Sequence, residues 1–177
     1  MRTTTLVAFT AALCLLACGK APEKVAEKAI ESSLSKDGTQ AKVSMGENSM
    51  KVTTTDASGK TTQLELGKAE VSEADLGVPF YPGAKPTDGS AMRIAAGEGS
   101  VVQMGMHSDD APDKVAAFYR DKLKAMAAGK QLMDMSSNDG ATLSLADEKT
   151  KSAIQVHIGK AEKGSDILIN STRGSAK

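Results

Sequence analysis

The sequence predicts an α+β protein built mainly of short antiparallel strands, with few helices. Nine short runs alternate apolar and polar residues, the pattern of strands that bury one face. Clusters of Gly, Asp, Asn and Ser separate most of these runs, as tight turns require. Only residues 21–36 and 111–128 place apolar side chains at helical spacing. The expected order is an N-terminal helix with a small antiparallel meander, then a ββαββββ domain with one helix packed on an antiparallel sheet.

Residues 1–17 have the composition of an export signal. Arg2 supplies the positive start, and Leu6 to Ala17 form an uncharged, mostly apolar run. Twelve helical residues span about 18 Å, well short of the hydrocarbon core of about 30 Å. The segment is therefore expected to be a signal peptide that is removed, rather than a transmembrane helix.

The end of this segment, Leu15-Leu16-Ala17-Cys18, resembles the lipobox of bacterial lipoprotein precursors. The resemblance implies cleavage between Ala17 and Cys18 and attachment of a lipid to the Cys18 thiol. Gly19, in the place where an aspartate favours retention at the inner membrane, implies an outer-membrane lipoprotein facing the periplasm. Cys14 is the rival lipidation site, but the bulky Leu13 precedes it. The alternative is an ordinary secretory signal followed by a chance cysteine.

Charge and cysteine content exclude several classes of function for the processed chain. The 177 residues hold 22 basic and 22 acidic side chains, so no electrostatic footprint for nucleic acid is present. With Cys14 removed and Cys18 acylated, no thiol remains for a disulfide or a thiolate metal site. Aromatic residues are scarce, and the core is expected to rest on aliphatic side chains and methionine.

Residues 18–36 are expected to form the lipid anchor and an amphipathic helix. The two acidic residues Glu27 and Glu31 are placed on its polar side. The helix is expected to dock weakly or to act as a stalk above the membrane, and a partner-binding helix is the alternative. Its modest apolar stripe consists of Val25, Ala26, Ala29, Ile30, Ser33 and Leu34.

Residues 37–70 are expected to form a small three-stranded meander with strands at Ala41 to Met45, Met50 to Thr55 and Thr61 to Leu66. Residues 71–89, rich in proline and glycine, are expected to be an extended connector. Within the connector, Phe80 and Tyr81 are interpreted as a buried strap, and an exposed aromatic lip for a ligand is the functional alternative.

Residues 90–177 are expected to form the α+β domain. Its helix, Ala111 to Ala128, has Asp110 as N-cap, Pro112 in the first turn and Gly129 just past its end. Phe118 is expected in the core, with Tyr119 at the edge of the apolar stripe and its hydroxyl toward water. The six strands are expected at Ser90 to Ala96, Ser100 to His107, Gln131 to Ser136, Ala141 to Ala146, Ala153 to Gly159 and Asp166 to Thr172.

The string DDAPDKVAAFYRDKLKA, preceded by VPFYPGAKP, resembles stretches of uncharacterised bacterial lipoproteins and periplasmic proteins. The shared features are a cap, a first-turn proline and an aromatic helix face, all of which structure alone explains. The resemblance implies no activity.

Catalytic groupings are weak in this sequence. His107 lies beside Ser108, Asp109 and Asp110, but neighbours on a turn rarely face one another as a triad requires, and no nucleophile-elbow motif is present. Helix capping is the preferred role of the two aspartates. His157 alternates with apolar neighbours and is expected to face outward.

Two Met-x-Met pairs, Met104 with Met106 and Met133 with Met135, could each present two thioethers on one strand face to Cu(I). The preferred interpretation is that these methionines fill an aromatic-poor core. No resident metal and no cofactor are expected.

Taken together, these features predict a membrane-anchored periplasmic lipoprotein that is not an enzyme and that acts by binding another envelope protein, as an inhibitor or immunity protein in the most specific version. The alternative is a periplasmic sensor or carrier of a metal, with copper held by the methionine pairs, or of a small apolar ligand.

Overall fold

The computed structural model describes residues 21–36, 38–67, 69–97 and 99–174. This part of the chain is an α+β structure dominated by one ten-stranded antiparallel sheet. Its helices are α1 (Ala21–Leu34), α2 (Glu73–Leu76) and α3 (Pro112–Ala125). Its strands are β1 (Gln40–Gly46), β2 (Ser49–Thr55), β3 (Thr61–Gly67), β4 (Lys85–Pro86), β5 (Ala91–Ala96), β6 (Gly99–Ser108), β7 (Gln131–Ser137), β8 (Gly140–Asp147), β9 (Ser152–Lys160) and β10 (Ser165–Arg173).

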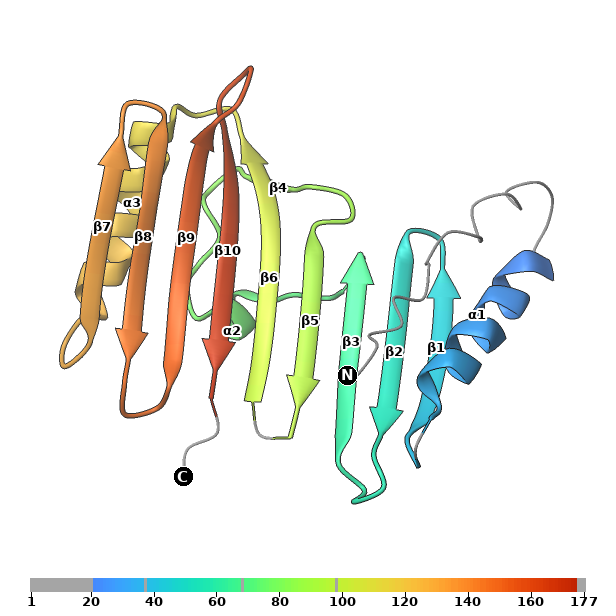
Figure 1. Ribbon diagram of the computed structural model, residues 1–177. Coiled ribbons are helices and arrows are strands. Elements are labelled where there is room, and N and C mark those ends of the chain that lie inside the picture. Colours follow the sequence, from blue (N-terminus) through green and yellow to red (C-terminus); the bar gives the residue numbers. More distant parts are fainter. Residues whose placement is uncertain (1–20, 37, 68, 98, 175–177) are drawn as a thin grey trace, which may run out of the picture.

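The sheet is continuous across the whole described chain, in the order β1-β2-β3-β5-β6-β10-β9-β8-β7, with β4 beside β6 (Figure 1). The nine predicted strands all occur, but the meander joins the other six strands because β3 pairs with β5 from Thr62↔Ala96 to Gly67↔Ala91. The predicted arrangement is therefore matched only in part. Residues 71–89, expected to be merely extended, contain α2 and β4.

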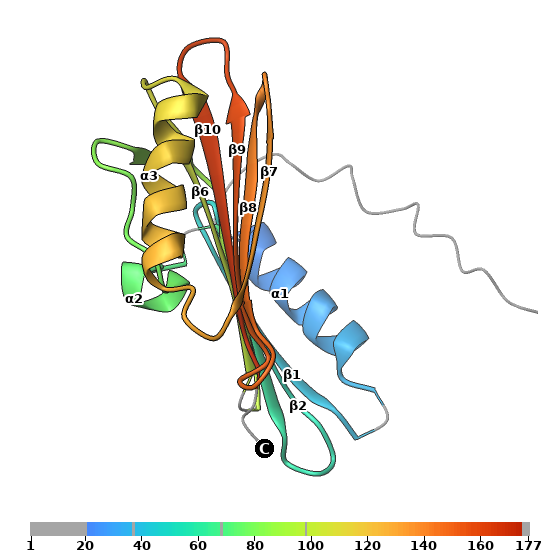
Figure 2. The same ribbon diagram turned by 90° about the vertical axis from the view of Figure 1, so that its left-hand side faces the viewer.

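The two faces of the sheet are covered differently. Helices α2 and α3 lie on one side, and α1 lies on the other side next to β1 (Figure 2). We call these sides the helix-covered face and the open face. Along each strand the side chains alternate between them, so Val156 and Ile158 of β9 enter the core while His157 faces the opposite way, as predicted.

The main core lies between the helix-covered face and helices α2 and α3. Its largest fully buried side chain is Tyr119, which is 0% exposed, whereas Phe118 is only partly buried against the same cluster. The prediction that Phe118 is the core residue and Tyr119 lies at the edge with its hydroxyl toward water is therefore wrong. Tyr119 is the core residue, and Phe118 lies at the edge. The ring of Phe118 instead packs edge-on between Tyr81, with ring centres 5.3 Å apart, and Tyr119, at 5.1 Å. Tyr81 is itself buried. This confirms the prediction that the connector is a buried strap, and it contradicts the alternative of an exposed aromatic lip.

The start of α3 also differs from the prediction. The N-cap is Ala111, which has no side-chain capping bond, and Asp110 is not the cap. The Asp110 carboxylate instead accepts hydrogen bonds from the Tyr81 hydroxyl, at 2.8 Å, and from Lys114 Nζ, at 2.9 Å. Lys114 and then Tyr81 lower the pKa of Asp110. The aspartate therefore ties the connector to the first turn of α3.

Helix α2 has a sequence signal that the predictions missed. Ser72 and Asp75 form a capping box, and Gly77 ends the helix in the left-handed conformation with φ 76°. Asp75 also pairs with Arg93 of β5 at 2.8 Å. This short helix thereby fixes the connector against the sheet.

Candidate binding surface

The open face carries a continuous apolar surface over one half of the sheet. The register aligns Val43 of β1 with Val52 of β2, and the same row continues across β3, β5 and β6 through Leu64, Ile94 and Val101. A second row, one step along the strands, contains Met45, Met50, Leu66 and Met92. We call the part of these rows on β3, β5 and β6 the apolar surface: Leu64, Leu66, Met92, Ile94 and Val101.

The face of the sheet that carries the buried apolar side chains therefore changes from one edge of the sheet to the other. In β8, β9 and β10 the buried residues belong to the helix-covered face, as in Leu143, Val156 and Ile169. In β1 and β2 the buried residues Val43 and Val52 belong to the open face, while Lys42 and Lys51 occupy the other side. Strands β5 and β6 lie at the change and carry apolar side chains on both faces.

Helix α1 covers the open face only at β1, outside the apolar surface. It packs along β1, and its contact side consists of Ala26, Glu27, Ile30 and Glu31, all partly buried. The predicted apolar stripe is wrong in part, because Val25 is 69% and Leu34 is 41% exposed. The prediction that Glu27 and Glu31 lie on a solvent-facing side is also wrong.

Glu27 and Glu31 close the free edge of β1. The backbone N–H of Val43 donates to Glu31 Oε1 at 2.8 Å, and the N–H of Met45 donates to Glu27 Oε1 at 2.6 Å. The N–H of Ala41 donates to Ser35 Oγ at 3.0 Å in the same series. Four helical residues rise about 6 Å and two strand residues about 6.7 Å, so the two repeats match. Sequence reasoning missed this role, whose only signal is the i, i+4, i+8 spacing of oxygen-bearing side chains.

The other half of the open face, over β8, β9 and β10, is mainly polar. Its central row consists of Ser144, Gln155 and Asn170, and it continues to Gln103 of β6. Thr142 and His157 are joined by a hydrogen bond of 3.1 Å on this face. The apolar surface is therefore bounded on one side by polar residues and on the other by β2, β1 and α1.

Two shallow grooves open to solvent lie at one end of the apolar surface. The first is lined by Met45, Met50, Leu66 and Ala69, and the second shares Met50 and Leu66 and reaches Gly89. Both follow the ends of β1, β2 and β3 near the Gly46–Ser49 turn. They make this end of the broad surface uneven.

The residues considered for catalysis are not brought together. Ser108 is buried on the helix-covered side, where its Oγ accepts a hydrogen bond from the Asp110 N–H at 3.1 Å. His107, the preceding residue of β6, points to the opposite face and contacts Asp166 at 2.9 Å. Asp109 contacts Lys163 at 3.4 Å. A Ser–His–Asp arrangement is therefore not formed by these residues.

The two methionine pairs lie on opposite faces of the sheet. Met104 and Met106 are buried in the core, at 7% and 2% exposure. Met133 and Met135 are 56% exposed on the open face of β7, so the prediction that the methionines fill the core is wrong for this pair. The nearest histidine in their row, His157, is two strands away, about 10 Å by strand spacing. Within the described residues, no group of three or more His, Cys, Asp or Glu side chains could hold a metal ion.

The residues expected at the lipidation site, Ala17 and Cys18, lie outside the described part of the chain. In the part that is described, no helix has the length and apolar character needed to span a bilayer.

Comparisons of this chain with protein-family models, with curated proteins and with solved structures gave no match.

Proposed function

We propose that this protein is a bacterial envelope lipoprotein, anchored through a lipid on Cys18, that binds another envelope protein with its apolar surface and catalyses no reaction. In the most specific form of this proposal it is an inhibitor or immunity protein whose partner is an exported toxin or a wall hydrolase. The anchor holds it at the outer membrane, facing the periplasm.

The observation that carries the proposal is the apolar surface itself. Leu64, Ile94 and Val101 lie side by side on three adjacent strands, on a face that α2 and α3 do not cover. The five side chains of the apolar surface are all partly exposed, and contiguous exposed apolar patches rimmed by polar residues mark interaction sites. Small ligands are held in concave pockets that enclose most of their surface, whereas a broad strand face fits the surface of a protein.

The position of α1 relates this surface to the proposed anchor. Helix α1 begins at Ala21, which is three residues after Cys18 in the sequence. A chain of three residues spans at most about 11 Å. Since Glu27 lies beside Met45, the start of α1 is near the Gly46–Ser49 turn. The anchor is then close to the β1 edge, and β3, β5 and β6 lie farther from it.

Site-specific photo-crosslinking in living cells of the source bacterium tests the proposal. A photoreactive residue in place of Met92, on the apolar surface, is compared with one in place of Gln63, which is exposed on the opposite face of β3. We expect Met92 to give a defined adduct with one other envelope protein and Gln63 to give none. Equal adducts from both positions, or none from either, would contradict binding by this surface.

A further inference from the structure

The two edge strands of the sheet differ in whether their outward backbone groups have hydrogen-bond partners. At the β1 edge, α1 lies alongside the strand and three side-chain oxygens accept its outward N–H groups. At the other edge, β7 has β8 as its one neighbour among the described strands (Figure 1), and every residue of β7 is exposed. An edge strand turns every second N–H and C=O away from its neighbour. Strand β7 therefore offers backbone groups for pairing with another strand.

Strand β7 also lacks most of the features that keep sheet edges from pairing. Such features include lysine, proline and bulges. Its sequence, Gln131–Ser137, has no lysine and no proline, and its register with β8 runs without a bulge from Gln131↔Ala146 to Ser137↔Gly140. Its single charge, Asp134, is already paired with Arg120 Nε of α3 at 2.5 Å.

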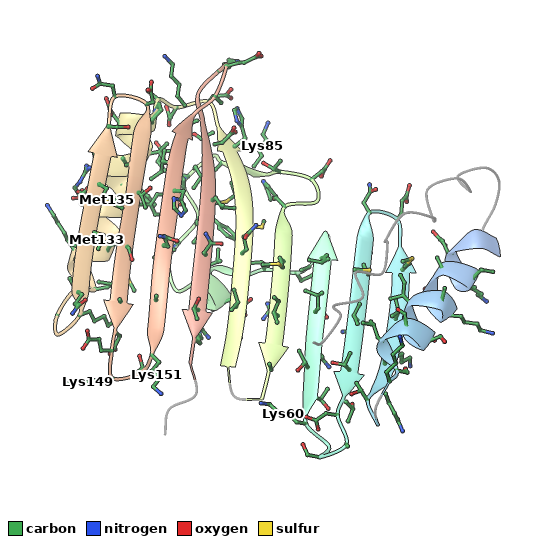
Figure 3. The ribbon with its side chains drawn as sticks, viewed as in Figure 1. Lys60, Lys85, Met133, Met135, Lys149 and Lys151 are labelled. Atoms are coloured by element: carbon green, nitrogen blue, oxygen red, sulfur yellow. The ribbon has the colours of Figure 1, made fainter. Side chains whose placement is uncertain are left out.

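The most exposed large apolar side chains of the sheet lie on this strand. Met133 and Met135 project from the open face at 56% exposure (Figure 3). Leu132, one residue along the strand, projects from the other face at 36%. These three are the exposed large apolar residues among the described strands. The strand that can accept a partner therefore also exposes apolar area that a partner would bury.

We propose that β7 pairs antiparallel with β7 of a second copy of this chain, with Asp134 at the two-fold axis. In this register Met133 lies opposite Met135 of the second copy, so four methionines form one apolar cluster on the open face. On the other face, the two Asp134 carboxylates lie opposite one another at the axis, and each is neutralised by the Arg120 guanidinium group of its own copy. The apolar pattern of the strand is thus complementary to itself, as a two-fold interface requires.

The size of this contact predicts a weak dimer. One pair of seven-residue strands buries less than the roughly 1,200 Å² of standard interfaces, which places it in the transient class. Backbone hydrogen bonds set the register, and the methionine cluster supplies most of the apolar burial. The proposal does not depend on the apolar surface of β3, β5 and β6, which lies several strands away.

Charge variants of the full-length protein in detergent micelles test the proposal by sedimentation over a range of concentrations. The variant Met133→Lys/Met135→Lys places like charges opposite one another across the two-fold axis, which is unfavourable. We expect its dimerisation constant to be at least about tenfold weaker than that of the unmodified protein, and that of Met133→Glu/Met135→Glu to fall similarly. An equimolar mixture of the two variants restores a heterodimer.

The matched control is Val25→Lys/Leu34→Lys, which makes the same change at two exposed positions of α1, outside β7. It leaves the dimerisation constant unchanged. All variants have highly exposed sites, so unfolding in urea verifies that their stability is retained. Three results would overturn the proposal: a monomeric unmodified protein up to about 1 mM, dimers that persist in the lysine variant, or a mixture that does not associate.

Discussion

Glu31 of α1 accepts a hydrogen bond of 2.8 Å from the backbone N–H of Val43 at the free edge of β1. Glu27 does the same for Met45 at 2.6 Å. A helix usually joins a sheet through apolar side chains, but here Val25 and Leu34 remain exposed and the contact depends on carboxylates. We infer that α1 is held to the sheet edge mainly by these two residues.

Replacing both carboxylates therefore releases α1. In Glu27→Ala/Glu31→Ala we expect the amide hydrogens of Val43 and Met45 to exchange at least about tenfold faster, because each loses a charge-assisted acceptor. Hydrogen exchange followed by NMR measures this. Glu23→Ala, at an exposed position in the first turn of α1, is the control. Unchanged protection in the double variant would show that other contacts hold the helix.

The exchange of roles between Phe118 and Tyr119 gives a second prediction. Tyr119→Ala is expected to lower the free energy of unfolding by about 3–5 kcal/mol, the range for emptying a buried aromatic site. Phe118→Ala is expected to cost about 1–2 kcal/mol, because only part of its surface is buried. Urea titration of both variants decides the order, and a larger loss for Phe118 would contradict the packing described above.

The Tyr119 hydroxyl gives a third prediction. It is buried without a hydrogen-bond partner among the described residues, and burial raises its pKa. An unpaired buried hydroxyl costs free energy. Tyr119→Phe is therefore expected to raise the free energy of unfolding by up to about 1 kcal/mol, as measured by urea titration. A loss of stability in this variant would show that the hydroxyl has a partner in solution.

The Asp75–Arg93 pair makes stability depend on pH. Arg93 and then Ser72 hold the pKa of the Asp75 carboxyl well below its usual range. A lowered folded-state pKa stabilises the protein above the unfolded value, about 3.9 for Asp, and this contribution is lost as pH falls below it. We expect the stability difference between the unmodified protein and Asp75→Asn to be largest near neutral pH and to shrink below about pH 4. A difference that stays constant down to pH 2 would contradict this.

The proposed anchor gives a prediction about processing. Because the lipid is attached to a thiol, Cys18→Ser is expected to abolish incorporation of radiolabelled palmitate and to leave the precursor uncleaved. Cys14→Ser serves as the control and is expected to be processed normally. Labelling of Cys18→Ser at the level of the unmodified protein would assign the lipid to Cys14 instead.

Local structure could be predicted well from the sequence. All nine predicted strands occur, with ends shifted by at most one residue, because alternation and turn residues are local signals. Helix α3 was also predicted from a local signal, the helical spacing of its apolar residues. It ends at Ala125 and not at Ala128. The capping box of α2 was readable from Ser72 and Asp75 but was missed.

The arrangement of these elements could not be predicted in the same way. Pairing of β3 with β5 joins strands that α2 and β4 separate in the sequence, and nothing local specifies it. The change of apolar side between β1 and β8 follows from that pairing. Glu27 and Glu31 look like ordinary solvent-facing charges until the edge of β1 is placed beside them. The apolar surface therefore became visible only when the strands were assembled.

Binding by the apolar surface is tested most directly by an affinity measurement. The envelope protein captured from Met92 is purified, and its dissociation constant for the full-length protein is compared for Ile94→Lys, on the apolar surface, and Gln63→Lys, on the opposite face. A lysine in the buried centre of an interface is expected to weaken binding by at least about tenfold, while the control binds as the unmodified protein does. Equal dissociation constants for the two variants, with both folded, would contradict the account.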